Sequence, residues 1–240
     1  MTKLRDVLPY RPRVVAAGLL AILAAPLVGC VDSRHPVSTA AQATADASIF
    51  GAWRVHIDDR AYLLVIGRPG EDAVGGALEA IPDGLMSIGV VTIRDPEGRH
   101  VVEANTFPAT ATAFLNADGK AWGVLSIPEY EDDMAELLPA RWDTTDAQTW
   151  LLLKYQIAGD RLRIWLPSTS KFKTAIERGE LEGRTGEEAD AGAFAQPVLT
   201  ASPQRLRIYL AGGGSLFEEE PALVLERSGV LEPATAANGG

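Results

Sequence analysis

The sequence predicts a mainly β protein, an antiparallel meander with two or three short helices in its C-terminal half. Short apolar runs recur between Ile49 and about Arg227, and turn-forming clusters such as Arg-Pro-Gly, Pro-Asp-Gly and Asn-Ala-Asp-Gly separate them. Apolar and polar residues alternate inside the runs, so Trp53, Val55 and Ile57 are expected to share one face of a strand. Helical spacing is found mainly after residue 168.

The strands follow one another at short intervals. Between residues 128 and 148 the alternation stops, and a short helix is expected over 130–138. Ala158, Gly159 and Asp160 then form the turn of a further hairpin. The expected strands cover residues 51–57, 61–67, 76–81, 85–93, 100–107, 110–115, 121–127, 150–157 and 161–167.

The last third of the chain mixes helices with a short strand. Phe172, Ala175 and Ile176 have helical spacing, with serines at 168–170 as N-cap candidates and Gly179 as a left-handed C-cap. A strand is expected at 198–200. Ser202 followed by Pro203 is typical of a helix start, so "RLRIYL" (205–210) is expected to be helical. The near-identical "RLRIWL" (161–166) leaves the alternative of a duplicated strand unit.

The first 30 residues form a secretory signal. Residues 1–13 carry four basic side chains and one acidic one, and an uncharged stretch follows at 14–28. As a helix, this stretch would be about 22 Å long, short of the roughly 30 Å hydrocarbon core of a bilayer. It ends in "LVGC", whose cysteine, Cys30, is the single cysteine of the chain.

The "LVGC" motif resembles the lipobox of bacterial lipoproteins. The resemblance implies that residues 1–29 are a cleaved signal peptide and that Cys30 carries a diacylglycerol and fatty chains such as palmitate, which anchor the protein to a membrane. The alternative is an uncleaved anchor helix with a buried cysteine. Val31, where many Gram-negative lipoproteins of the inner membrane have Asp, favours the periplasmic face of the outer membrane over the inner membrane.

Four segments follow from these observations. The signal peptide is residues 1–29, and 30–48 is predicted to be a lipidated flexible tether, because 31–48 is rich in Ala, Ser and Thr and has no aromatic residue. Eighteen such residues have a reach of about 23 Å. Residues 49–227 form a single globular domain, and 228–240 is expected to be a loose tail.

Gly51-x-Trp53 opens the domain and resembles the signature of lipocalins. The resemblance implies a barrel or half-barrel in which Trp53 lies at the floor and packs against a basic residue of a late strand; Arg205, Arg207 and Arg227 are the candidates. The alternative is a strand tryptophan in any β core. The segment from Trp150 to "LFEEE" also resembles a pattern in bacterial lipoproteins without an assigned activity.

Charge and composition disfavour several classes of function. Removing residues 1–29, of net charge +3, from a chain of net charge −10 leaves the mature chain at −13, which disfavours nucleic acid as a partner. The three histidines, at 35, 56 and 100, are not spaced as a pair of zinc ligands, and none forms a recognisable pair with a nucleophile. Ser87 in "LMSIG" lacks the first glycine of the nucleophile-elbow motif Gly-x-Ser-x-Gly.

No catalytic residue, cofactor or metal is therefore expected. The acidic runs at 58–59, 129–133 and 218–220 are expected to be solvated surface, with a calcium site at 129–133 as the alternative. The glycines of "GGGS" at 212–215 follow a helix, and phosphate loops precede one, so a helix terminator is expected.

The expected function is that of a membrane-anchored, non-catalytic binder of a small apolar or lipid-like ligand. The alternative is an envelope protein-protein interaction or assembly factor with a solid core, using the acidic segment 129–146 as its surface.

Overall fold

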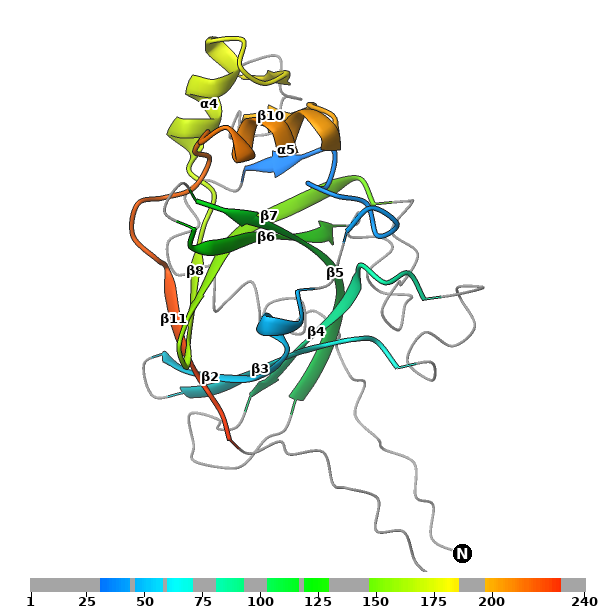
Figure 1. Ribbon diagram of the computed structural model, residues 1–240, viewed down its shortest axis with the longest axis vertical. Helices are drawn as coiled ribbons and strands as arrows, with labels where there is room; N and C mark the ends of the chain where they lie inside the picture. The colour runs from blue at the N-terminus through cyan, green and yellow to red at the C-terminus, as the bar shows by residue number, and fades with distance from the viewer. Residues whose placement is uncertain are drawn as a thin grey trace, which may run out of the picture.

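A computed structural model describes residues 31–43, 46–57, 60–70, 81–92, 103–116, 119–129, 147–185 and 197–229. Within them, eight antiparallel strands form a closed barrel (Figure 1). They are β2 (Gly51–Ile57), β3 (Arg60–Gly67), β4 (Leu85–Thr92), β5 (Glu103–Leu115), β6 (Ala121–Glu129), β7 (Thr149–Ala158), β8 (Arg161–Trp165) and β11 (Leu223–Arg227). β11 pairs with both β8 and β2 and so completes the ring. The predicted antiparallel meander is confirmed, as a closed lipocalin-like barrel.

The longest strand, β5, differs from its prediction. The sequence predicts two strands around Pro108, but β5 runs through it as one strand of 13 residues. Pro108 pairs with Ser87 of β4, whereas the ladder to β6 begins two residues later, at Thr110. A proline has no N–H to donate, and it is tolerated where one side of the strand has no ladder partner.

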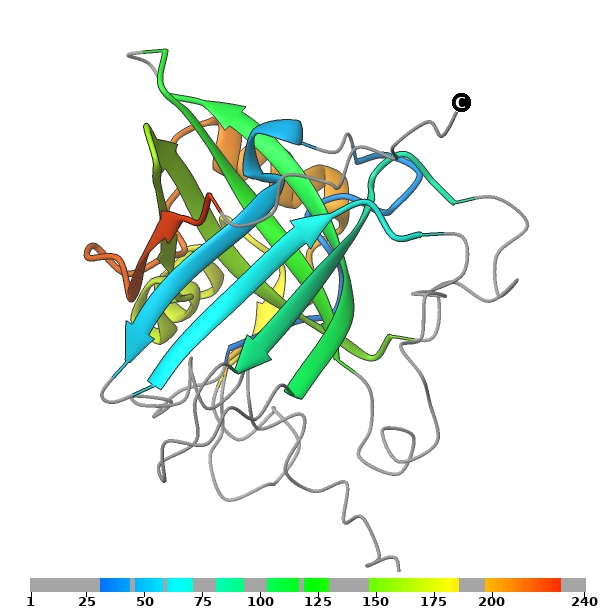
Figure 2. The same cartoon turned by 90° about the horizontal axis from the view of Figure 1, so that it is seen from below.

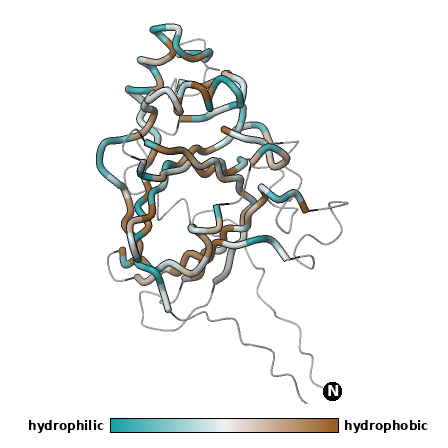
Figure 3. Tube along the Cα trace, in the orientation of Figure 1, coloured by the Kyte–Doolittle hydropathy of each residue, from teal (hydrophilic) through white to brown (hydrophobic). Residues whose placement is uncertain are grey.

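Alternate residues of the barrel strands point inward and form the first hydrophobic core. Trp53, Val55 and Ile57 share the inner face of β2 as the alternation predicts, with Ile57 partly buried. Figure 3 shows hydrophobic residues concentrated in the strands of the barrel. The other buried members are Ile49, Tyr62, Leu64, Ile66, Met86, Ile88, Val90, Ala109, Ala111, Leu125, Ile127, Leu153, Tyr155, Leu162, Ile164 and Leu225.

A second hydrophobic core lies outside the barrel. Two helices, α4 (Thr169–Glu177) and α5 (Pro203–Ala211), and three short strands, β1 (Asp32–Ser33), β9 (Gly183–Arg184) and β10 (Val198–Leu199), lie over the outer side of β6 and β7 (Figure 1). Their apolar side chains, such as Phe172 and Leu206, pack with Trp150 and Leu152 of β7. β6 and β7 are therefore covered on both faces.

The two similar hexapeptides adopt different structures. "RLRIW" is strand β8, whereas "RLRIYLA" lies in helix α5. The Ser202 hydroxyl accepts a hydrogen bond from the Arg205 N–H at 3.3 Å, and Pro203 is the first helical residue, so the local capping decides the second copy as predicted. In α4, Ser168 occupies the N-cap position, but its hydroxyl bonds with that of Ser170 at 3.2 Å instead of capping the backbone.

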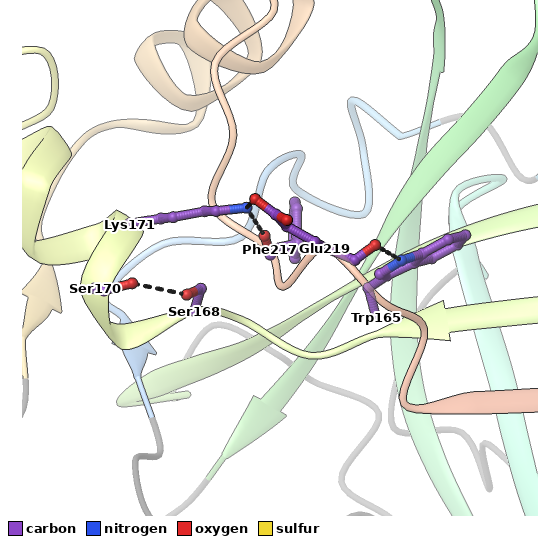
Figure 4. A network of polar contacts seen from close by, with 6 residues as sticks. All are labelled: Trp165, Ser168, Ser170, Lys171, Phe217 and Glu219. Atoms are coloured by element: carbon purple, nitrogen blue, oxygen red, sulfur yellow. Dashed lines mark hydrogen bonds and ion pairs between the residues drawn. The ribbon is translucent and has the colours of Figure 1, made fainter.

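Polar contacts tie the start of α4 to the segment that precedes β11 (Figure 4). Lys171 Nζ donates to the Phe217 carbonyl at 2.8 Å and lies 3.9 Å from the Glu219 carboxylate. The indole N–H of Trp165 donates to the Glu219 carbonyl at 3.1 Å. These contacts join the start of α4, the segment 217–219 and the end of β8.

The prediction of a flexible tether is wrong for the described part of residues 31–48. Val31 and Val37 are 1% and 0% exposed and belong to the second core. The Val37 N–H donates to the Ser126 hydroxyl at 3.1 Å, and the Thr110 hydroxyl donates to the Ser38 carbonyl at 2.9 Å. The Ala-, Ser- and Thr-rich composition suggested flexibility, but polar groups of this segment pair with hydroxyls on the outer face of the barrel and hold the segment in place. The globular domain thus begins before Ile49.

Several predictions fall outside the described residues: the signal peptide and Cys30, the strand at 76–81, the helix at 130–138 and the tail from 230 to 240. Within the ranges that are described, no helix combines the length and apolar character needed to cross a bilayer.

Candidate functional site

Trp53 is buried near one end of the barrel, at the start of β2. Its side chain is 0% exposed, and its indole N–H donates to the Ile49 carbonyl at 2.8 Å. Ile49 ends a short 3-10 helix, η2 (Ala47–Ile49), which lies across the ring of strands in Figure 1 and at the upper end of the barrel in Figure 2. We call this end, where β2, β4 and β6 begin, the closed end, and the opposite end the mouth.

Arg227, the last residue of β11, packs on Trp53. Its guanidinium carbon is 4.1 Å from the centroid of the indole ring, and its two terminal nitrogens each donate at 3.0 Å, to the Phe50 and Ser48 carbonyls. Gly51 has φ +131°, and a Cβ there would lie 2.9 Å from the arginine. A cation on an indole face and two charge-assisted hydrogen bonds thus join the last strand to the first.

The other two arginine candidates lie elsewhere. Arg205 and Arg207 are on α5, where Arg205 bonds the Glu180 carbonyl at 2.9 Å and Arg207 bonds the Val37 carbonyl at 3.2 Å. Sequence spacing alone could not choose among the three, because the choice depends on which segment pairs with β2.

A buried tyrosine completes the closed end. Tyr155 is 1% exposed, and its hydroxyl donates at 2.8 Å to Asp46, the N-cap residue of η2. Burial, the Asp46 charge and this hydrogen bond all raise the pKa of Tyr155, so it is a neutral donor. A Cβ on Gly123 would overlap the tyrosine ring, at 2.3 Å, so a residue without a side chain is needed opposite it.

The half of the barrel toward the mouth contains a partly enclosed cavity of about 30 Å³. Its lining is made of apolar side chains and the ring of Tyr62, all from the inner faces of strands. Trp53 and Tyr155 are not among the lining residues, so the cavity ends on the mouth side of these two residues. The lining residues are Val55, Tyr62, Leu64, Ile88, Val90, Leu125, Ile127, Leu153, Ile164, Leu223 and Leu225.

The strands separate toward the mouth. β5 pairs with β6 from Thr110 to Leu115, and the residues of β5 nearer the mouth have no partner on β6 among the described strands. β2 pairs with β11 only at Trp53 and Arg54, next to the closed end. Two seams of the barrel therefore have fewer ladder hydrogen bonds at the mouth, and opening them costs less there than at the closed end.

Two carboxylates lie beside the mouth. Asp32 of β1 is near Glu129, the last residue of β6, and the Thr149 hydroxyl donates to Glu129 at 3.2 Å. Burial raises the pKa of both acids; the Asp32 charge raises that of Glu129 further, and Arg34 partly offsets the rise at Asp32.

A lysine lies between two tryptophans on the outer face of the barrel. Lys154 Nζ is 5.2 Å from the ring centroid of Trp122 and 4.9 Å from that of Trp165, and Trp122 stacks on Phe114 at 4.6 Å. Burial and the nearby Lys171 lower the pKa of Lys154. Cation-π contacts of this kind stabilise a partly desolvated ammonium.

The remaining candidates are not brought together into a site. His35 and His56 are exposed, and Ser87 lies within β4, which continues as a strand through it. Glu218, Glu219 and Glu220 are exposed, and no group of three or more potential metal ligands occurs in the described ranges. His100, the acids at 58–59 and residues 130–133 lie outside those ranges.

Comparison of the chain with protein-family models, curated proteins and solved structures gives no match. The lining of the cavity is the part of the site that sequence reasoning missed. Alternation marks these residues as inward-facing, but it does not distinguish residues that fill a core from residues that border a space.

Proposed function

We propose that this protein is a membrane-anchored, non-catalytic binder that takes an apolar or lipid-like chain into the mouth half of its barrel. The observation that carries the proposal is the apolar cavity, bordered by strands on its sides and by Trp53 and Tyr155 below. Any ligand would enter from the mouth, because η2, Trp53 and Arg227 occupy the other end.

The chemistry of the cavity favours hydrocarbon over water. A space of about 30 Å³ could hold one or two water molecules, but an apolar lining offers them few of the two to four partners that a buried water needs. An alkyl group has no hydrogen bonds to lose there, and burial of each methylene contributes about 0.8 kcal/mol to the free energy of binding.

Most ligand pockets are larger, about 300–1,000 Å³. The present cavity therefore receives only the end of a chain, and deeper binding requires the mouth to widen. The two seams with few ladder pairs, β5–β6 and β2–β11, are where such widening costs least.

The anchor in this proposal is the lipid on Cys30, with the periplasmic face of the outer membrane favoured by Val31. A Cys30→Ser variant should be released from membranes and should incorporate no radioactive palmitate. Equal membrane partitioning of variant and parent would contradict the anchor.

Ligand binding is tested on the acyl-free domain, residues 31–240, purified from cells. Native mass spectrometry should detect a co-purified lipid, and titration with dodecanoate should show saturable binding at one site. An empty domain that binds no dodecanoate would contradict the proposal.

The small size of the cavity supports a second candidate, an envelope interaction or assembly factor with a solid core. This candidate predicts an empty domain that binds one envelope protein in a pull-down, and loses that partner when acidic residues of segment 129–146 are replaced by neutral ones.

A further inference from the structure

Neither of the two described α-helices covers the wall of the barrel that is centred on β2. The helices lie over the outer side of β6 and β7, and β2 is four strands away from β6 in either direction around the ring. Figure 2 shows β2, β3 and β4, in blue to teal, in front of the orange helix α5. We call the outward side of β4, β3, β2, β11 and β8 the arginine wall, after Arg54, Arg161 and Arg163.

A single rung of the sheet crosses the arginine wall and changes from apolar to charged side chains. In register order it consists of Val91, Leu63, Arg54, Glu226 and Arg161. These side chains point outward, because their neighbours along each strand belong to the core inside the barrel. The three charged residues are exposed, whereas Val91 and Leu63 are half-buried and belong to neither hydrophobic core.

Aliphatic side chains continue on both sides of this rung. Val65 lies two residues after Leu63 in β3 and is half-buried. Val224 of β11 is 44% exposed and pairs with Arg163 of β8. The arginine wall therefore presents aliphatic and guanidinium groups side by side.

The three arginines of this wall are not neutralised by the described part of the chain. Glu226 lies opposite Arg54 and Arg161 in the ladder, but within the described ranges the side chains of Arg54, Arg161 and Arg163 have no hydrogen bond or ion pair. The whole chain has a net charge of −10. Three arginines without a carboxylate partner on one wall of such a chain indicate an anionic partner from outside it.

We infer that the arginine wall rests on an anionic lipid bilayer, with its guanidinium groups among the lipid phosphates and its aliphatic side chains toward the acyl chains. Guanidinium groups bind phosphate oxygens in a bidentate manner, and amphipathic helices that lie on membranes combine the same two kinds of side chain. The inference extends the proposed function, because it names the surface that a membrane-anchored domain turns toward the bilayer. The contact itself is made by side chains and does not require the lipid on Cys30.

The residue types on the arginine wall favour a bilayer over a protein partner. The outward side chains of β4, β3, β2 and β11 include no Phe, Tyr or Trp in the described ranges, and the cavity lies inside the barrel. Protein interfaces gain most of their binding energy from aromatic and arginine anchors that fill desolvated pockets. A bilayer surface requires no such pocket.

Charge determines which side of the protein faces the bilayer. Each arginine close to an anionic surface contributes about 1 kcal/mol, a factor of about five in an equilibrium constant. Glu226 offsets about one of the three arginines. The exposed residues 218–220 are all glutamates, and Glu219 lies 3.9 Å from Lys171 of α4, so an anionic surface repels the helix side.

The experiment uses the full lipidated chain, purified from membranes and reconstituted in phosphatidylcholine vesicles with or without phosphatidylglycerol. Acylation of Cys30 leaves one added cysteine as the single free thiol for a fluorescent donor. His56→Cys places the donor on the arginine wall, and Gln204→Cys places it on α5 at the helix side; both residues are exposed. Acceptor dye on the lipid head groups reports the height of each donor above the bilayer.

With phosphatidylglycerol present, energy transfer should be stronger from position 56 than from position 204. Replacing the three arginines of the arginine wall with glutamine should shift the orientation equilibrium by about 100-fold and remove the difference. The matched control makes the same change in net charge on the helix side, with Lys173→Gln, Arg178→Gln and Arg205→Gln, and should keep the difference. Equal urea midpoints for the two triple variants exclude unfolding as the cause.

Equal transfer from the two positions, or an equal loss in the control variant, would overturn the inference. Self-quenching of donors at position 56 together with equal transfer would indicate a second copy on the wall and would also overturn it. Flotation separates these failures from failure of the anchor. A protein that floats with both kinds of vesicle but shows no difference refutes the arginine wall alone. One that floats only with phosphatidylglycerol supports the wall and refutes the lipid anchor, and one that floats with neither refutes both.

Discussion

Replacing Val90 with isoleucine should fill the cavity and stabilise the protein. Val90 lines the cavity and is 2% exposed, and the change adds one methylene without altering the branching at Cβ. At about 24 cal/mol per Å³, filling about 30 Å³ contributes about 0.7 kcal/mol, and burial of one methylene contributes about 0.8 kcal/mol. The midpoint of thermal unfolding should rise by about 4 °C for a domain of this size.

The same change should weaken ligand binding. A chain that loses the space of one methylene loses about 0.8 kcal/mol, a rise of about fourfold in the Kd for dodecanoate. Urea unfolding followed by tryptophan fluorescence and calorimetric titration measure the two effects. The matched control is Val124→Ile: Val124 is 0% exposed in the second core, where overpacking should cost about 1–3 kcal/mol without changing the Kd. Stabilisation by Val90→Ile with an unchanged Kd would refute the cavity as the ligand site.

Three further changes test other parts of the structure. Arg227→Ala should lower the free energy of unfolding by about 2 kcal/mol in urea titrations, because a cation-π contact and two hydrogen bonds are lost, whereas Arg161→Ala, on an exposed residue of β8, should change it by less than about 0.5 kcal/mol. Glu129→Gln should raise the unfolding temperature at pH 7. The pKa of Glu129 is raised in the folded state, so ionisation of Glu129 opposes folding as the pH rises above about 4.5. An equal rise in unfolding temperature at pH 4 would contradict this cause. A soluble chain that begins at residue 46 instead of 31 loses the buried side chains of Val31 and Val37 and should be at least about 3 kcal/mol less stable; equal unfolding midpoints for the two chains would contradict the packing of that segment.

The barrel was predictable because its strands obey a local rule. Alternation of apolar and polar residues identifies the inward residues of β2. The Ser202-Pro203 pair identifies the start of α5, although the similar sequence at 161–166 forms a strand. These features depend on neighbouring residues in the sequence.

Features set by distant residues were not predictable. Arg227 is 174 positions after Trp53, and only the pairing of β11 with β2 brings them together. Residues 31–43 lack any periodic pattern, because they lie over the outside of the barrel and their partners, such as Ser126 and Thr110, come from barrel strands. The cavity exists because the inward side chains do not completely fill the barrel. Alternation in the sequence shows which side chains point inward, but it does not show whether their volumes fill the interior.

The closure of the ring by β11 has a consequence for how the protein is made. Ribosomal synthesis delivers β2 long before residues 223–227, so every earlier intermediate has two unpaired sheet edges, on β2 and on β8. Pairing across such a long sequence separation is slow. A chain that ends before Leu223 lacks β11, so it should stay open between β2 and β8 and be prone to aggregation.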